Sequence, residues 1–177
     1  MGKIQINLRE GSLIQEDVII GIDLGTTNSL AAFWNEETGK PEMIPVDESG
    51  NLLPSVLHIS ETGEFIVGGR GKALLSIEPE STIFSVKSLI GRTNADLLKL
   101  PFQVPYTIAP GSETDWVKLL VRGKVYSPIE VSAHFLSKIK ESAERYLKKT
   151  VSRCVVTVPA YFTEVQRQST EIGRAHV

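Results

Sequence analysis

The chain has little that would suit an oxidising compartment, a metal cluster or a membrane. Its single cysteine, Cys154, excludes an intrachain disulfide. His58, His134 and His176 lie far apart, and Cys154 has no Cys-x-x-Cys partner, so no metal cluster is expected. No apolar run approaches the roughly 20 residues that a membrane-spanning helix needs. The N-terminal residues alternate polar and apolar and do not resemble a signal peptide.

The formal charge is nearly balanced, which argues against a nucleic-acid or anionic membrane surface. The net charge is −2 and the isoelectric point about 6.0. Hydrophobic residues make up 41% of the chain, which is enough for the core of a globular protein. We therefore expect a cytoplasmic globular protein with neither nucleic acid nor membrane as a partner.

The first part of the chain predicts a β-hairpin. Residues 1–17 are interpreted as an N-terminal extension with room for one edge strand. Two apolar runs, residues 18–24 and 29–35, then flank a Gly-Thr-Thr-Asn turn, and a third strand is predicted near residues 42–46. These strands are predicted to begin the core.

Residues 47–126 have a different pattern. Short apolar stretches are broken by Gly and Pro, and the section ends in a predicted hairpin around an Arg-Gly turn. The sequence VGGRGK, residues 67–72, lacks the spacing of a phosphate loop and is predicted to be a surface turn. The order of elements predicts a mixed α/β fold with an inserted α+β subdomain. Residues 18–46 and 127–170 would form its base, and residues 47–126 the insertion.

The clearest helix is predicted to begin after Ser127. Ser127 is a good N-cap, Pro128 suits the first turn and Glu130 completes a capping box. Apolar residues recur at helical spacing and predict one buried face: Ile129, Ala133, Leu136, Ile139, Ala143 and Leu147. On the other face, two ion pairs are predicted four residues apart, Glu141 with Arg145 and Glu144 with Lys148.

A continuously apolar strand follows this helix and contains Cys154, which is expected to be an inert buried side chain. Pro159 is predicted to end the strand. Thr163 and Gln166 then form a second capping box at the start of another helix. Tyr161 and Phe162, between the strand and the helix, are expected to pack in the core.

The stretch GIDLGTTNS places one carboxylate, Asp23, just before a turn of small residues. Backbone N–H groups of such a turn, with the side chains of Thr26, Thr27 and Asn28, favour an anion, and Gly25 permits close approach of a ligand. A single carboxylate suits Mg²⁺, which keeps much of its water shell. The alternative is a plain hairpin whose Thr and Asn residues serve the turn alone. An acid at the end of an apolar strand favours the phosphate and magnesium site.

Three motifs carry a family resemblance. The stretches GIDLGTTNS, FSVKSLIGR and VVTVPAYFTEVQRQST resemble segments of the seventy-kilodalton heat-shock chaperone family (DnaK-like), in the family's order and at its spacing. The first motif is only moderately specific, since sugar kinases and actin-like filament proteins carry similar turns, whereas the last is highly specific. The resemblance covers about residues 18–170.

The resemblance implies an actin-like (ribonuclease-H-like) fold in which two lobes close around ATP, and it covers the first lobe only. It implies that Gly25, Thr26, Thr27 and Asn28 line the phosphates of ATP or ADP, and that Asp23 lies near a water-bound Mg²⁺.

The other two motifs carry the remaining implied roles. Lys87 matches the catalytic lysine that reaches the γ-phosphate, where a fixed cation stabilises developing charge. Without the resemblance, Lys87 would be read as a solvated surface lysine. Pro159 and Arg167 match the residues that relay nucleotide state to the substrate-binding domain.

The resemblance also implies partners: protein clients held by a peptide-binding domain, a J-domain co-chaperone and a nucleotide-exchange factor. The catalytic glutamate, the second phosphate loop and the peptide-binding domain would lie beyond residue 177, so the 177 residues alone are expected to be inactive. ATP hydrolysis is expected of the full-length protein. The N-terminal extension and the stretch NLLPSV resemble, more narrowly, the branch devoted to iron–sulfur-cluster assembly (HscA-like).

The last residues raise a separate hypothesis. IGRAHV, residues 172–177, can be encoded by DNA that resembles a common sequencing-library adapter, so residues 171–177 are interpreted as a non-native tail. The alternative is a natural divergent terminus. Three other functions stay open: a sugar-kinase-type phosphotransferase, an actin-like filament protein, and a ligand-binding module without turnover.

Overall fold

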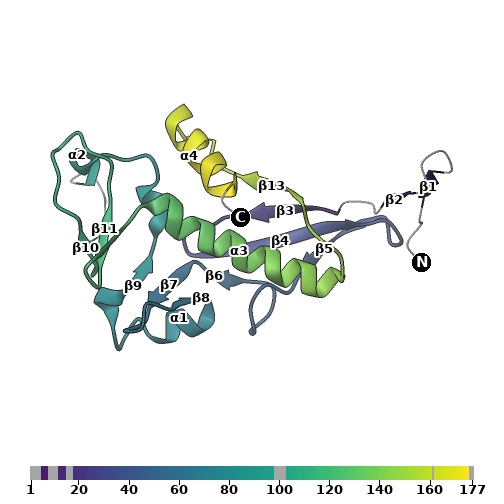
Figure 1. The fold of residues 1–177 in the computed structure, drawn as a ribbon, viewed down its shortest axis with the longest axis horizontal. Coiled ribbons are helices and arrows are strands. Elements are labelled where there is room, and N and C mark those ends of the chain that lie inside the picture. Colours follow the sequence, from purple (N-terminus) through teal and green to yellow (C-terminus); the bar gives the residue numbers. More distant parts are fainter. Residues whose placement is uncertain (1–4, 8–11, 15–17, 98–102, 161, 176–177) are drawn as a thin grey trace.

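The structure is a computed structural model that describes residues 5–7, 12–14, 18–97, 103–160 and 162–175 (Figure 1). The predictions made for Tyr161 and His176 concern residues outside these ranges.

The centre of the molecule is a mixed sheet with the strand order β13-β3-β4-β5. β3 (Ile19–Asp23), β4 (Asn28–Asn35) and β5 (Lys40–Ile44) form an antiparallel meander. β13 (Arg153–Thr157) lies parallel to β3, and the short β6 (Leu53–Pro54) pairs with β4. The predicted hairpin and the mixed α/β class are therefore confirmed.

The two faces of this sheet differ in exposure. The row of paired residues Val156, Ile22, Ala31 and Ile44 faces the core, where Ile22, Ala31 and Ile44 are buried. The next row, Val155, Gly21, Ala32 and Met43, faces the other way, and Val155 is 63% exposed. The continuously apolar sequence predicts a buried strand, and this prediction is wrong for the outer face of β13, because no described element covers that face. Cys154, on the inner face, is half-buried.

Helix α3 (Pro128–Leu147) covers the inner face of the sheet and runs from the inserted section (residues 47–126) back along the sheet (Figure 1). Its capping box is confirmed: Glu130 N–H donates to Ser127 Oγ at 3.1 Å, and Ser127 N–H donates to Glu130 Oε2 at 2.6 Å. The ion pair of Glu141 with Arg145 is confirmed as well. The pair of Glu144 with Lys148 is wrong, because Glu144 Oε1 instead accepts from the backbone N–H of Val151 at 3.0 Å.

The buried face of α3 is rotated from the predicted one. Leu136, Ile139 and Ala143 are buried as expected, whereas Ile129, Ala133 and Leu147 are only half-buried. The helix packs on the sheet and on the inserted section at the same time, so its buried stripe is wider and shifted. It also includes Pro128, Val131, Ser132, Phe135 and Ser142.

The inserted section contains two small antiparallel sheets. One has the order β8-β7-β9, made by β7 (Val56–Ile59), β8 (Phe65–Val67) and β9 (Thr82–Phe84). The other is formed by β10 (Thr107–Ile108), β11 (Leu119–Val121) and β12 (Lys124–Tyr126). The predicted hairpin is confirmed at the β11–β12 turn, where Arg122 and Gly123 have φ values of 48° and 73°, as a two-residue hairpin turn requires.

Short helices complete the fold: α1 (Gly69–Ala73), α2 (Asn94–Leu97), and the 3₁₀ helices η1 (Pro79–Ser81) and η2 (Val86–Leu89). α1 corrects the prediction of a surface turn. Gly71 is buried there, and a Cβ at this position would lie 2.3 Å from the Ile66 carbonyl oxygen. The glycines thus serve close packing of α1 against β8.

A hairpin of two strands precedes the central sheet in the sequence, and a helix follows it. In the N-terminal extension, β1 (Gln5–Asn7) and β2 (Ser12–Ile14) pair with each other and not with the central sheet. Near the other end, α4 (Glu164–Ala175) packs against α3. Its predicted capping box is confirmed by the bonds from Gln166 N–H to Thr163 Oγ1 at 3.3 Å and from Thr163 N–H to Gln166 Oε1 at 3.0 Å.

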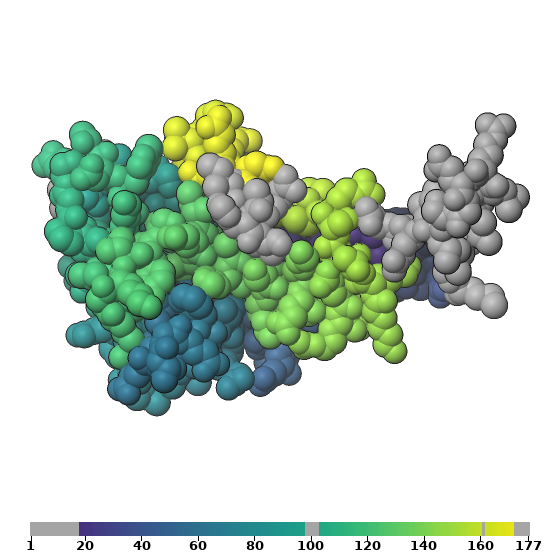
Figure 2. Space-filling model, viewed as in Figure 1, coloured from purple at the N-terminus to yellow at the C-terminus, as the bar shows by residue number. Residues whose placement is uncertain are grey.

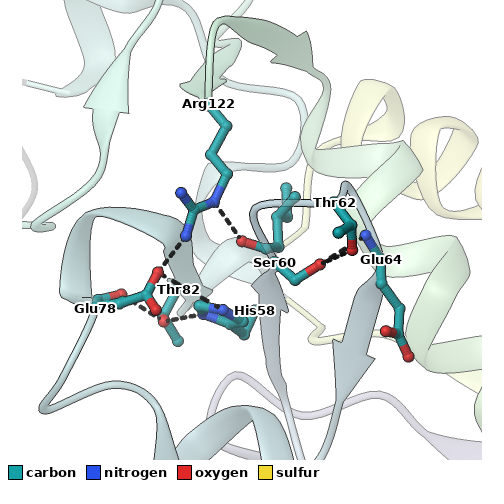
Figure 3. A network of polar contacts seen from close by, with 8 residues as sticks. His58, Ser60, Thr62, Glu64, Glu78, Thr82 and Arg122 are labelled. Atoms are coloured by element: carbon teal, nitrogen blue, oxygen red, sulfur yellow. Dashed lines mark hydrogen bonds and ion pairs between the residues drawn. The ribbon is translucent and has the colours of Figure 1, made fainter.

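A polar network holds the two small sheets together (Figure 3). Arg122 pairs with Glu78 and donates from Nε to the Ile59 carbonyl at 2.8 Å. The buried His58 shares a hydrogen bond of 2.9 Å with Thr82 Oγ1, which donates to the Glu78 carbonyl at 2.7 Å. Since the Thr82 proton is used there, His58 Nδ1–H is the donor, and His58 Nε2 faces Glu78 at 3.9 Å from Oε2.

Candidate functional site

The site begins where two parallel strands end side by side. Asp23 is the last residue of β3 and Thr157 the last of β13, and the two are partners in the parallel register. Both side chains are exposed, and Thr157 Oγ1 donates to Asp23 Oδ1 at 2.7 Å. The sheet therefore places a hydrogen-bonded carboxylate at its edge, next to the β3–β4 turn.

The turn itself is compact. A Cβ at Gly25 would lie only 1.9 Å from the Asn28 carbonyl oxygen, so no other residue fits this backbone. Thr26, Thr27 and Asn28 are exposed, and in the described part of the chain their side chains have no hydrogen-bond partner. Their donors are therefore directed to solvent and available to a ligand.

Two serines that no sequence motif singled out, Ser29 and Ser55, bond to the turn. Ser29 is fully buried and Ser55 nearly so, and their hydroxyls lie 3.0 Å apart. Gly25 N–H donates to Ser29 Oγ, so this backbone donor is not available to a phosphate. Ser55 Oγ donates to the Gly25 carbonyl at 2.9 Å, and Ser55 N–H donates to the Thr27 carbonyl at 2.8 Å. The inserted section thus clamps the turn through Ser55.

Lys87 is brought to this site by η2. Its neighbours Val86 and Leu89 are buried, and the Lys87 ammonium lies over the ring of Phe162, 5.8 Å from the ring centroid. Burial lowers the pKa of Lys87, and the nearby Asp23 carboxylate opposes this effect. Asp23 and Lys87 are distant in the sequence, and the fold brings their charges within electrostatic reach of each other.

The β13–α4 connection links Lys87 to the two predicted relay residues. Phe162, expected to be core packing, is buried and donates its N–H to the Pro159 carbonyl at 3.1 Å. Arg167, on α4, donates to the carbonyls of Phe162 and Ala160, each at 3.2 Å. Pro159 and Arg167 are therefore joined through one tight loop, whose Phe162 ring lies beneath Lys87.

The α4 side of this loop is fixed by Gln166. Gln166 is buried and donates from Nε2 to the Ile90 carbonyl at 3.0 Å. A Cβ at Gly91, next in the chain, would lie 2.7 Å from the Gln166 side chain, so the two segments are in close contact. The segment that follows η2, which carries Lys87, and the helix that follows the Pro159 loop are thus packed together.

A concave region lies away from these residues. It is a groove of about 750 Å³ between α3 and the chain around β8 and α1, which are neighbours on the face shown in Figure 2. Its lining mixes both charge signs, among them Glu48, Glu64, Arg70 and Lys138. It contains none of the predicted site residues, so the groove gives no support to the nucleotide site.

The residues at the ends of β3 and β13 fit phosphate groups and Mg²⁺, which the family resemblance implied. A carboxylate and hydroxyls are hard oxygen ligands of the kind that Mg²⁺ prefers, and a lysine with small polar donors suits phosphate oxygens. The described residues contain no group of three or more His, Cys, Asp or Glu side chains that could hold a metal. A metal at Asp23 would accordingly keep most of its water shell.

The fold defines the class of this protein as an actin-like ATPase first lobe. A family model described as Hsp70 protein matches residues 19–174, which is most of the chain. The chain therefore belongs to the Hsp70 family, whose members are chaperones that bind ATP with Mg²⁺. In the part of the chain that the structure describes, no helix is both long and apolar enough to span a membrane.

Proposed function

We propose that this chain binds ATP with Mg²⁺ at the ends of β3 and β13. The observation that supports it best is the hydrogen-bonded Asp23 carboxylate at the strand ends, beside a solvent-facing turn of small polar residues and within electrostatic reach of Lys87. Thr26, Thr27 and Asn28 would donate to phosphate oxygens, and Gly25 gives the turn its shape. Asp23 would hold Mg²⁺ through water, and Lys87 would face the terminal phosphate.

The chemistry assigned to Lys87 is electrostatic. Bound Mg²⁺ and a fixed ammonium both neutralise the charge of a phosphoryl group. The Phe162 ring and partial burial restrict the Lys87 side chain before any ligand arrives, which reduces the entropy lost on binding. Lys87 is thus proposed as the catalytic lysine of the ATPase.

The binding test is an NMR titration of the 177-residue chain with Mg·ATP. Backbone signals of residues 23–28 should shift, and Lys87→Ala should weaken binding about tenfold, since a charge-assisted contact is lost. Lys72→Ala is the matched control, because Lys72 is an exposed lysine outside the site. Equal affinities of the two variants would refute the role of Lys87.

We further propose that these residues alone do not turn ATP over. Thr26, Thr27 and Asn28 are exposed on one side of a single lobe, and a half-enclosed site loses much of the affinity that enclosure supplies. Phosphate release should equal that of buffer. Turnover by the wild type that is lost in Lys87→Ala would overturn this proposal.

At the level of the cell, we propose a cytoplasmic ATP-dependent chaperone whose nucleotide state controls client binding. Pro159 and Arg167, joined through their loop, would relay that state to a peptide-binding domain. A J-domain co-chaperone and an exchange factor would be partners. The family match argues against the sugar-kinase and filament alternatives.

A narrower proposal is the iron–sulfur-assembly branch, which is supported only by the N-terminal extension and the stretch NLLPSV. The sequence of the genomic DNA across the codon for Thr170 tests both the general chaperone proposal and this narrower one. A frame that continues into a second phosphate loop and a peptide-binding domain with that branch's signatures would support them. It would also decide whether residues 171–177 are native; α4 and the family match both extend beyond Thr170.

A further inference from the structure

Thr157 holds the carboxylate of Asp23 in a fixed direction. In residues 18–97, 103–160 and 162–171, its hydroxyl is the only hydrogen-bond donor to this carboxylate, at 2.7 Å. Both side chains are exposed, so without this bond the Asp23 side chain would be free to change rotamer. No local motif marks Thr157, because its partner Asp23 lies on another strand.

The position of Thr157 is well suited to restrain the side chain of Asp23. The parallel register sets its Cα opposite that of Asp23, and the β13–β3 pairing fixes both backbones. A threonine side chain is also stiff at χ1, so its hydroxyl is presented in one direction. The bond occupies Oδ1 and leaves Oδ2 to accept from other donors.

We propose that Thr157 is a positioning residue for the hydrated divalent cation at Asp23. This inference rests on the proposed function, because it assumes that Asp23 receives such a cation. Groups that orient a metal's ligands from outside commonly change metal affinity about 10–100-fold. For a carboxylate that binds through water, we expect a smaller effect of about 3–10-fold.

The test uses Mn²⁺ alone as the probe, added to the 177-residue chain. Paramagnetic broadening of the amide signals of residues 23–25 reports the cation without nucleotide or turnover. Thr157→Val removes the hydroxyl but keeps the β-branched shape, and Thr157→Ser restores the hydroxyl. Because Thr157 is exposed, neither substitution opens a cavity. Asp23→Asn removes the carboxylate and gives the background broadening that Mn²⁺ causes without it.

The inference predicts about 3–10-fold weaker Mn²⁺ affinity in Thr157→Val and recovery to within about twofold in Thr157→Ser. Metal-free ATP should bind the wild type and Thr157→Val equally. An unchanged Mn²⁺ affinity in Thr157→Val, no recovery in Thr157→Ser, or no broadening in the wild type would each overturn it. Failure of the proposed function appears separately, as an absence of ATP-induced shifts at residues 26–28.

Discussion

Gly25 is the position in the candidate site that leaves the least room for a side chain. Gly25→Ala would place a Cβ 1.9 Å from the Asn28 carbonyl oxygen, and backbone atoms would have to shift. We expect a loss of about 2–3 kcal/mol in the free energy of unfolding and a displaced turn. Gly21→Ala is the matched control, since its nearest atom would be 3.9 Å away. Urea denaturation should show a change within about 0.5 kcal/mol for this control; comparable losses in the two variants would contradict the prediction.

His58 makes the stability of the inserted section depend on pH. Burial lowers its pKa, the Glu78 carboxylate raises it and the Arg122 guanidinium lowers it (Figure 3). At His58 the folded chain therefore binds fewer protons than the unfolded chain. The contribution of His58 to the free energy of unfolding is full above the ordinary pKa of 6.5 and is lost as the pH falls below it.

Urea denaturation at pH 7.5 and pH 5.5 should show the smaller free energy of unfolding at the lower pH. His58→Gln should reduce this difference, by at most about 1.4 kcal/mol per pH unit. His134, whose pKa is also lowered by burial, remains in both proteins and contributes to the pH dependence that is left. An identical pH dependence in the variant would refute the role of His58.

At the scale of the element, α3 depends on its capping box. Ser127→Ala removes the acceptor of the Glu130 N–H bond and should cost about 1 kcal/mol. Ser137→Ala is the control on the same helix, because Ser137 is exposed and alanine is the better helix former. Thermal denaturation should show a lower midpoint only for Ser127→Ala. If both variants unfold alike, the cap contributes nothing.

At the scale of the whole molecule, the outer face of the central sheet is apolar and exposed. Trp34 is 60% exposed, Met43 39% and Val155 63%. Exposed apolar patches of this kind promote association. We expect the chain to self-associate as its concentration rises, measured by sedimentation velocity.

Val155→Glu should reduce this association, since it buries a charge in any contact made through the outer face. Ile77→Glu is the matched control, because Ile77 is 70% exposed but lies in the inserted section. Equal effects of the two substitutions would mean that overall charge, not the sheet face, governs association.

Local patterns by themselves determined much of this protein. The β3–β4 hairpin, both capping boxes, the Arg122-Gly123 turn and the α/β class followed from short-range signals, because turns, caps and helical periodicity are set by neighbouring residues. The family resemblance selected Asp23, Lys87 and the turn between β3 and β4 as candidates.

Only the tertiary structure decided which face of each element is buried and which distant groups meet. The stretch from Cys154 into the following residues is nearly all apolar and predicts a buried strand, yet the outer face of β13 is exposed, since burial depends on what packs against it. The stripe of α3 is shifted because two layers contact it. The bond from Thr157 to Asp23, the clamp by Ser55 and the contact of Lys87 with Phe162 join residues remote in the sequence. No local pattern records such pairs, because strand pairing and packing create them.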